Sequence, residues 1–254
     1  MENALETQGL RRTFGKTVAV DGIDLRVPQG SFYGFLGPNG AGKSTTIKCL
    51  TGLLKPTAGS MSILGLDPLK DPVEVKRRVG VVPEDLALFE RLTGRETLTF
   101  VGQVHGLEDA ALKSRSEELL GLMALQEAAG DIVTDYSHGM RKKLALAAAL
   151  LPSPRVLFLD EPFEGIDAVA SRQIKSLLAR FVHGGRTIFL TSHILEVVES
   201  LCDHIGVIHQ GRLVAQGPLK HLQEGRQGKS LEQIFLDLVG AHEVDMQDLE
   251  WLNT

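Results

Sequence analysis

Short runs of consecutive apolar residues alternate along the chain with longer segments whose apolar positions recur at helical spacing. Segments 32–36 and 155–159 are typical of strands buried on both faces, and segments 45–54 and 168–182 are typical of amphipathic helices. Such alternation predicts a mostly parallel sheet with helices on both faces. Further strands are predicted at 60–65, 79–82 and 187–190, and further helices at 72–78, 140–151 and 194–202.

The N-terminal thirty residues read as strands without intervening helices. Apolar positions between 18 and 27 suggest extended structure, interrupted by a turn at Asp21-Gly22. A second pair of short apolar segments, 205–208 and 213–215, flanks a glycine turn and resembles a hairpin. We therefore expect strands in the first thirty residues and a hairpin at about 205–215.

A central region of the chain lacks the β-branched runs found elsewhere. It extends from about residue 86 to residue 140, and Thr93, Asp109 and Gln126 each stand where a helical stretch would begin. Between these points the apolar residues recur at helical spacing with charges between them. We expect an all-helical insert here.

One glycine-rich segment, 37–45, fits the phosphate-loop pattern G-x-x-x-x-G-K-[ST] in full and lies between a predicted strand and a predicted helix. Glycines let backbone N–H groups face a phosphate, and the positive end of the following helix points at the same place. The lysine would add charge for the β- and γ-phosphates, and the serine a hydroxyl for Mg²⁺. The alternative is a glycine-rich turn with an incidental lysine. The predicted nucleotide-binding residues are Gly37, Pro38, Asn39, Gly40, Ala41, Gly42, Lys43, Ser44 and Thr45.

Two adjacent carboxylates, Asp160 and Glu161, follow the apolar strand at 155–159. Ligands of such sheets bind at the carboxyl ends of the strands, so a long sequence separation from the phosphate loop is no obstacle. Asp160 would hold Mg²⁺ through water, and Glu161 would polarise the attacking water. The bland alternative is a solvated strand end. His193 follows the next strand and could donate to the γ-phosphate, although a lone histidine is usually structural.

An aromatic residue, Phe14, lies upstream of the loop in Thr13-Phe14-Gly15. Its ring could stack on a nucleotide base, because a flat base needs an aromatic face. Packing in the core is the other interpretation, and the sequence does not decide between them.

Composition narrows the class of protein. The 254 residues, 43% hydrophobic and 23% charged, fit one large domain or two small ones. The net charge of −5 and the lack of a strongly basic segment give a nucleic-acid partner no support. The first six residues do not look like a signal peptide, and the longest apolar run, 144–151, is too short to span a bilayer. We expect a soluble chain whose membrane role, if any, comes through a partner.

The segment Tyr136-Ser137-His138-Gly139-Met140, followed by three basic residues, decides the family. With the phosphate loop and the carboxylate pair, it resembles the nucleotide-binding subunit of ATP-binding cassette (ABC) transporters, over nearly the whole chain to about Gly217. The family signature at this place is usually Leu-Ser-Gly-Gly-Gln. The resemblance implies an ABC-type P-loop NTPase fold: a mostly parallel core sheet, an N-terminal antiparallel β subdomain and an all-helical insert.

The same resemblance implies roles and partners. ATP is the substrate and Mg²⁺ the cofactor, Phe14 matches the base-stacking aromatic, and Glu161 and His193 match the catalytic carboxylate and the switch histidine. In the family two subunits sandwich two ATP head to tail. The residues that would serve the opposite subunit's ATP are Ser137, His138, Gly139, Met140 and Asp167. The second subunit would be the same chain or a paralogue, and an integral membrane permease would be a separate chain.

Three segments depart from the family pattern. Glu84 stands where the family usually has glutamine; it could still ligate Mg²⁺, but its charge would repel the γ-phosphate. His138 replaces the first signature glycine and Met140 the signature glutamine, while the serine and backbone donors survive. The loop before Asp167 is Phe-Glu-Gly-Ile instead of the common Ser-Ala-Leu.

The variant signature and the ending at 230–238 resemble the subgroup that serves ABC-2-type exporters. This implies an ATPase domain at 1–220, with the helical subdomain at about 86–140 inserted, and a C-terminal helix and acidic tail at 221–254. The expected location is the cytoplasmic face of the cell membrane. The rival interpretation is a soluble regulatory or assembly ATPase of the same fold; a nucleotide-binding subunit without hydrolysis is disfavoured because Glu161 and His193 are present.

Overall fold

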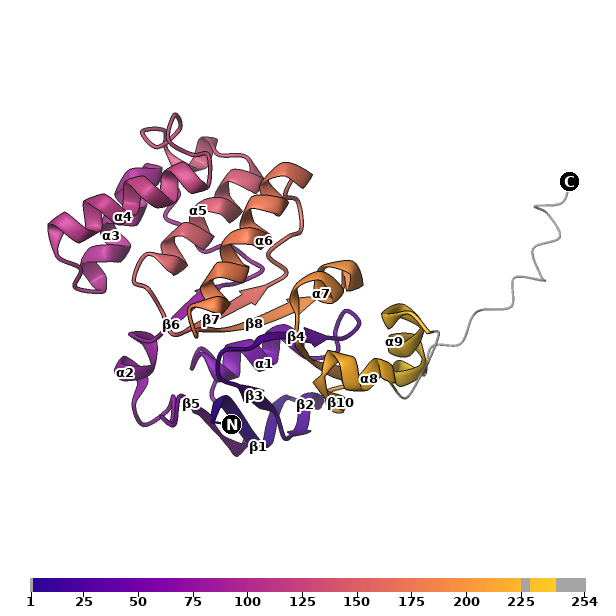
Figure 1. The fold of residues 1–254 in the computed structure, drawn as a ribbon. Coiled ribbons are helices and arrows are strands. Elements are labelled where there is room, and N and C mark those ends of the chain that lie inside the picture. The colour runs from indigo at the N-terminus through magenta and orange to yellow at the C-terminus, as the bar shows by residue number, and fades with distance from the viewer. Residues whose placement is uncertain (1, 225–228, 241–254) are drawn as a thin grey trace, which may run out of the picture.

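A six-stranded sheet forms the centre of the computed structural model, which describes residues 2–224 and 229–240 (Figure 1). The strand order is β10-β9-β4-β8-β7-β6, and all neighbours are parallel except β10, which pairs antiparallel with β9. The strands are β4 (Phe32–Leu36), β6 (Val79–Val82), β7 (Val156–Asp160), β8 (Thr187–Ser192), β9 (His204–His209) and β10 (Arg212–Pro218). Every residue of β4, β7 and β8 is buried, as continuous apolar strands covered on both faces should be.

An antiparallel sheet from the N-terminal part of the chain packs beneath the core sheet. Its strands are β1 (Asn3–Phe14), β2 (Thr17–Ile23), β3 (Arg26–Pro28) and β5 (Ala58–Ile63). The long strand β1 pairs with each of the other three. Helix α1 (Lys43–Leu50) contacts strands of both sheets and lies between them (Figure 1).

The remaining helices lie on the opposite face of the core sheet and at its flanks (Figure 1). Ser137 and Asp167 cap α5 and α6, each accepting a hydrogen bond from a backbone N–H in the first turn. A capping box between Thr93 and Glu96 begins α3. These helices are α2 (Pro72–Lys76), α3 (Gly94–Val104), α4 (Asp109–Leu122), the 3₁₀ turn η1 (Val133–Asp135), α5 (His138–Leu150), α6 (Ala168–His183), α7 (Leu195–Leu201), α8 (Leu219–Glu224) and α9 (Leu231–Val239).

The core sheet separates two clusters of buried apolar side chains. One joins the sheet to α5, α6, α7 and the helical subdomain; the other joins it to α1 and the N-terminal sheet. Phe189 on β8 stands at the centre of the second cluster. Its ring centroid lies 5.6 Å from that of Tyr33, 5.2 Å from Phe35 and 5.8 Å from Phe158. This aromatic layer locks three strands of the sheet to one another.

Three expected local features are wrong in detail. Asp21-Gly22 is not a turn: β2 continues through it with an irregular register against β1, and Gly22 has a positive φ of 72°. The connection after α4 does not begin a helix at Gln126, and a turn there leads into η1. Helix α5 begins at His138, two residues before the expected Met140, because Ser137 caps it.

The C-terminal helix rests on the main body of the fold. Leu231 and Ile234 of α9 are buried, and the Leu231 N–H donates to the Glu199 carboxylate on α7 over 3.2 Å. The expected division at residue 220 remains a prediction, and the acidic tail at 241–254 lies outside the described residues. Within residues 2–224 and 229–240, none of the helices combines the length and the apolar character that crossing a bilayer requires.

Phe189→Ala should lower the free energy of unfolding by about 3–5 kcal/mol, because it removes a buried ring that contacts three others. Chemical denaturation gives this value. Leu53→Ala is the control, since Leu53 is 63% exposed and its truncation should change stability by about 0.5 kcal/mol or less. A loss below about 1 kcal/mol for Phe189→Ala would contradict the role of the aromatic layer.

Candidate functional site

The phosphate loop connects the buried strand β4 to the N-terminus of α1. Gly42 is the N-cap of α1 and adopts the left-handed conformation with φ of 111°. A Cβ atom there would lie 2.4 Å from the carbonyl oxygen of Ala19, so any side chain would force the loop away from β2. Gly42, one of the glycines predicted to let the backbone curl, is therefore required by the packing as well.

Lys43 lies folded over the loop that precedes it. Its Nζ donates to the carbonyl oxygens of Gly37, at 2.7 Å, and Pro38, at 3.3 Å. The same Nζ lies 3.9 Å from Oε1 of Glu161, and both side chains are less than one-tenth exposed. The loop lysine and the carboxylate that follows β7 thus form a buried ion pair at the carboxyl edge of one sheet.

Glu161 is held in an uncommon backbone conformation. Its φ is +48°, in the left-handed region that non-glycine residues rarely occupy. The Glu161 N–H donates to the carbonyl oxygen and to Oγ1 of Thr191, at 3.3 and 3.2 Å. The side chain lies 3.0 Å from Nδ1 of His193 through Oε2. Since such a backbone costs about 1–3 kcal/mol, the neighbours of Glu161 must stabilise it, and it is a mark of functional sites.

Asp160 lies deeper in the sheet than Glu161. It is 3% exposed, and its Oδ1 accepts a hydrogen bond from the Thr191 hydroxyl. Thr191 therefore contacts both carboxylate residues, one through its side chain and one through its backbone and side chain. The orientation of both depends on the parallel pairing of β7 with β8, which places Asp160 opposite Thr191.

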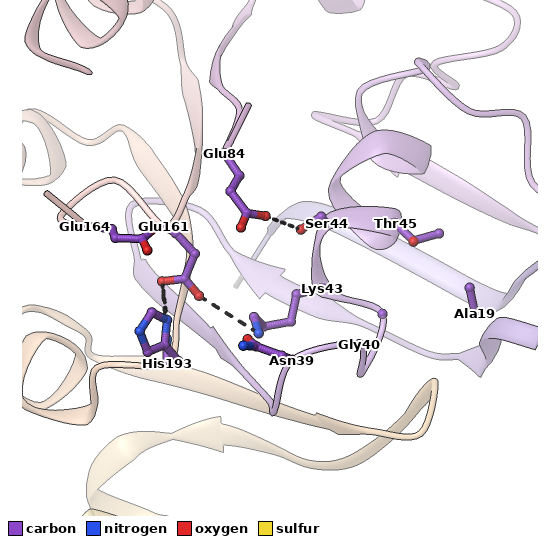
Figure 2. Close-up of a pocket in the computed structure, with 11 residues that line it drawn as sticks. Ala19, Asn39, Gly40, Lys43, Ser44, Thr45, Glu84, Glu161, Glu164 and His193 are labelled. Atoms are coloured by element: carbon purple, nitrogen blue, oxygen red, sulfur yellow. Dashed lines mark hydrogen bonds and ion pairs between the residues drawn. The ribbon is translucent and has the colours of Figure 1, made fainter. Parts of the chain in front are cut away.

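Lys43, Glu161 and His193 line a cavity of about 280 Å³, whereas Asp160 and Thr191 are not among its lining residues (Figure 2). Glu161 lies between Lys43 and His193, and Glu84 reaches toward Ser44 from the other side (Figure 2). The walls are mainly polar: the phosphate loop and Lys43 supply hydrogen-bond donors, and Glu84, Glu161 and Glu164 supply carboxylates. A site for a phosphate chain with a bound cation requires both kinds of group. The lining residues are Ala19, Asn39, Gly40, Gly42, Lys43, Ser44, Thr45, Glu84, Glu161, Glu164 and His193.

The donor set at one end of this cavity fits Mg²⁺. Ser44 Oγ donates to Glu84 Oε2 over 3.4 Å, so a hydroxyl and a carboxylate meet beside the loop. Mg²⁺ prefers such oxygen ligands and usually keeps several waters besides substrate phosphates. In the parts of the chain that the structure describes, no group of three or more His, Cys, Asp or Glu side chains could hold a metal alone.

Phe14 lies at the end of β1 and is 43% exposed, so the core-packing interpretation of this ring is wrong. The Arg12 guanidinium lies 4.4 Å from the ring centroid. Base stacking by Phe14 stays a prediction.

The signature residues do not line the cavity of their own chain. Ser137 and His138 are exposed at the N-terminus of α5, and Gly139 packs close to the loop before α6: a Cβ on it would lie 3.2 Å from the Gly165 carbonyl oxygen. Asp167 caps α6, and the hydrogen bond from the Ala170 N–H keeps the pKa of its carboxyl below the usual value. Their predicted role, together with Met140, toward a second subunit's ATP stays a prediction.

Four residues at or beside the site escaped the sequence analysis: Ala19, Thr191, Glu164 and Lys142. Ala19 touches the cavity because β2 passes over the loop. Thr191 directly precedes Ser192-His193, and that position beside a predicted switch histidine was the available signal. Lys142 is 3% exposed and donates from Nζ to the Glu161 carbonyl oxygen over 2.9 Å. The basic run at 141–143 entered the sequence analysis only as the continuation of the signature segment and gave no such signal.

A family model and the sequences of known proteins both match this chain. The family model for the ABC transporter matches residues 20–164, more than half of the chain. A daunorubicin/doxorubicin resistance ATP-binding protein, DrrA of Streptomyces peucetius, is 40% identical over 87% of this chain and 67% of its own length. A bacitracin transport ATP-binding protein, BcrA of Bacillus licheniformis, is 38% identical over 91% of this chain and 75% of its own.

Solved structures agree with this assignment. An ATP-binding subunit of an ABC transporter superposes with a TM-score of 0.88 at 32% identity, covering 92% of this chain and 99% of that one. A dimeric ATP-binding cassette bound to ADP and phosphate shares the fold, with a TM-score of 0.78 at 22% identity over 85% of this chain and 98% of that one. The expected fold class and family are therefore confirmed. The chain belongs to the ABC transporter family, as one of the ATP-binding subunits whose ATPase activity drives transport.

Proposed function

We propose that this subunit powers export through a separate integral membrane subunit and that it hydrolyses ATP with Glu161 as the group that polarises the attacking water. The placement of Glu161, 3.9 Å from the loop lysine and 3.0 Å from His193 at the mouth of the phosphate cradle, carries the assignment of its role. Relatives named for drug resistance and bacitracin transport support the direction of transport. The proposed location, on the cytoplasmic face of the cell membrane, follows from such a partner.

The chemistry divides among the residues of the cavity. Lys43 and the loop amides neutralise the β- and γ-phosphates, and His193 donates to the γ-phosphate. Glu161 accepts a proton from water as the water oxygen attacks the γ-phosphorus and the bond to ADP breaks. Mg²⁺, held by Ser44 and Asp160 with Glu84 as a further ligand, would neutralise charge on the β- and γ-oxygens. Phe14 would stack on the adenine.

The far side of the site would come from a second ATP-binding subunit, either another copy of this chain or a paralogue. Ser137 and Gly139 stand at the exposed N-terminus of α5, which does not line the cavity of its own chain and suits a phosphate. Asp167 stands beside them at the start of α6. ATP would then hold two subunits together head to tail until hydrolysis releases them.

Glu161→Gln should lower kcat for ATP hydrolysis by about 100-fold or more, because an amide cannot accept the proton of the attacking water. ATP binding should persist, so an ATP-bound dimer should accumulate. Steady-state phosphate release and size-exclusion chromatography with ATP measure the two effects. Equal ATPase activity in the variant and the wild type would contradict the role proposed for Glu161.

Thr191→Val should lower kcat by about tenfold or more, because it removes the hydroxyl that donates to Asp160 and accepts from the Glu161 N–H. Thr191→Ser keeps the hydroxyl and should retain most of the activity. ATP titrations of the three proteins give kcat and KM. If serine and valine lose activity equally, the hydroxyl does not orient the carboxylates.

An exposed apolar patch on the helical subdomain suits the membrane partner. Phe89 and Phe100 are 56% and 42% exposed, and their rings meet edge to face with centroids 5.0 Å apart. Val104, one helical turn after Phe100 on α3, is also exposed. Large apolar side chains gathered on one surface favour a protein partner. We place the contact with the permease on this patch, beside the loop that carries Glu84.

Phe100→Asp should reduce the amount of membrane subunit recovered with this chain from detergent-solubilised membranes by about tenfold, as loss of a central aromatic contact does. Leu53→Asp, an equally drastic change at another exposed apolar residue, is the control and should leave recovery unchanged. A wild-type chain that never recovers an integral membrane protein would instead support the rival, a soluble regulatory or assembly ATPase.

A further inference from the structure

The signature helix α5 carries a lysine that reaches the chain's own catalytic loop. Lys142 lies in the second turn of α5 and is 3% exposed, an unusual burial for an ammonium group. Its Nζ donates to the Glu161 carbonyl oxygen over 2.9 Å and lies 3.8 Å from Glu164 Oε2. Glu164 is 57% exposed and lines the nucleotide cavity. A buried charge persists only where it is paired and hydrogen-bonded, so these contacts hold Lys142 in place.

The two basic neighbours of Lys142 on α5, Arg141 and Lys143, interact with other parts of the fold. Arg141 donates to the carbonyl oxygens of Val133 and Thr134 and so ties α5 to the 3₁₀ turn before it. Lys143 is half-buried, and its charge acts on Asp167. Of the three consecutive basic residues, Lys142 is the one with a hydrogen bond to the residue we propose as catalytic.

The contact acts on a peptide whose position decides where the Glu161 carboxylate points. Glu161 has a left-handed backbone, fixed on its N–H side by Thr191 of β8. On its carbonyl side, the acceptor is engaged by Lys142 and, at 3.5 Å, by the Glu164 N–H. Removal of the lysine would leave this carbonyl with a long hydrogen bond within its own loop. The peptide could then turn toward a commoner conformation and carry the carboxylate away from Lys43 and His193.

Lys142 also lies on the same rigid helix as the exposed phosphate-binding end. Ser137 caps α5, and Lys142 follows five residues later, about 7.5 Å along the helix axis. A helix moves as a unit over so short a distance. Displacement of its N-terminus by a nucleotide would therefore shift Nζ relative to Glu161.

We propose that Lys142 is a positioning residue that links the signature end of α5 to Glu161, so that ATP held by one site sets the catalytic carboxylate of the other. This inference rests on the proposed two-subunit site. Burial lowers the pKa of Lys142, while the charges of Glu164, Glu161 and Glu84 oppose that shift and favour the ammonium form that donates.

Two variants matched in length separate the hydrogen bond from simple packing. Lys142→Met removes the donor, whereas Lys142→Gln keeps an N–H donor on a side chain as long as that of methionine and one atom shorter than that of lysine. We expect Lys142→Met to lower kcat by about 10-fold to 100-fold with KM for ATP within about twofold, and Lys142→Gln to stay within about threefold of wild type. Lys113→Met, at an exposed lysine of α4, controls for loss of a lysine. Equal losses in the methionine and glutamine variants, or wild-type kcat in the methionine variant, would overturn the proposal.

Two further measurements complete the test. A double-mutant cycle with Ser137→Ala tests whether the signature end acts through Lys142. The double variant should lose little more kcat than the worse single variant, and fully independent losses of kcat would refute the link.

Adding Glu161→Gln to Lys142→Met should still give an ATP-bound dimer. If Glu161→Gln alone traps no dimer, the proposed two-subunit site is wrong. If Glu161→Gln traps a dimer while Lys142→Met keeps full kcat, only the proposed role of Lys142 is wrong. Should Lys142→Met not fold, a loss above tenfold in Lys142→Gln overturns the proposal.

Discussion

The buried pair of Lys43 and Glu161 is the interaction on which the rest of the site depends. Two opposite charges that are nearly inaccessible to water must be satisfied by the fold, because removal of one leaves the other buried and unpaired. The carbonyl oxygens of the loop accept hydrogen bonds from the lysine, and the ring and backbone N–H of His193 lie at Oε2 of the glutamate. Both sets of partners stand at the carboxyl edge of one sheet because β4, β8 and β7 are adjacent in it. The register of these strands is therefore as much a part of the site as its side chains.

The two faces of the sheet contribute differently. On one face, α1 and the N-terminal sheet hold the phosphate loop, and Ala19 of β2 leaves no room for a side chain at Gly42. On the other face, α5 and α6 bring their capped N-termini to one place, where Gly139 and Gly165 pack backbone against backbone. Lys142 crosses from this second layer to the carboxyl edge. The nucleotide cradle and the signature end thus belong to separate layers, and the Lys142 side chain reaches from one to the other.

Much of this could be predicted from the sequence because the signals are local. The phosphate loop is one continuous segment, and Asp160, Glu161 and His193 follow apolar strands whose parallel pairing brings their ends together. Thr191, Glu164 and Lys142 could not be assigned, since their roles depend on which backbone atoms lie opposite them after folding. The same limit explains Asp21-Gly22, where a dipeptide typical of turns is absorbed by an irregular strand pairing. At Gln126 the expected start of a helix is wrong, because the polar residue there lies in a turn.

The strand order also constrains how the chain folds during its synthesis. The strand that bears the phosphate loop, β4, has β8 and β9 as its neighbours, with Phe32 opposite Ile188 and Tyr33 opposite His204. Both neighbours are synthesised long after β4 has left the ribosome. A nascent chain consequently holds an apolar, unpaired strand through most of its synthesis, and such edges are prone to aggregation. Pairing of distant segments is slow as well. The phosphate loop is made early, but β8, which pairs with β4 and leads to His193, is made late, so the complete nucleotide cradle forms late as well.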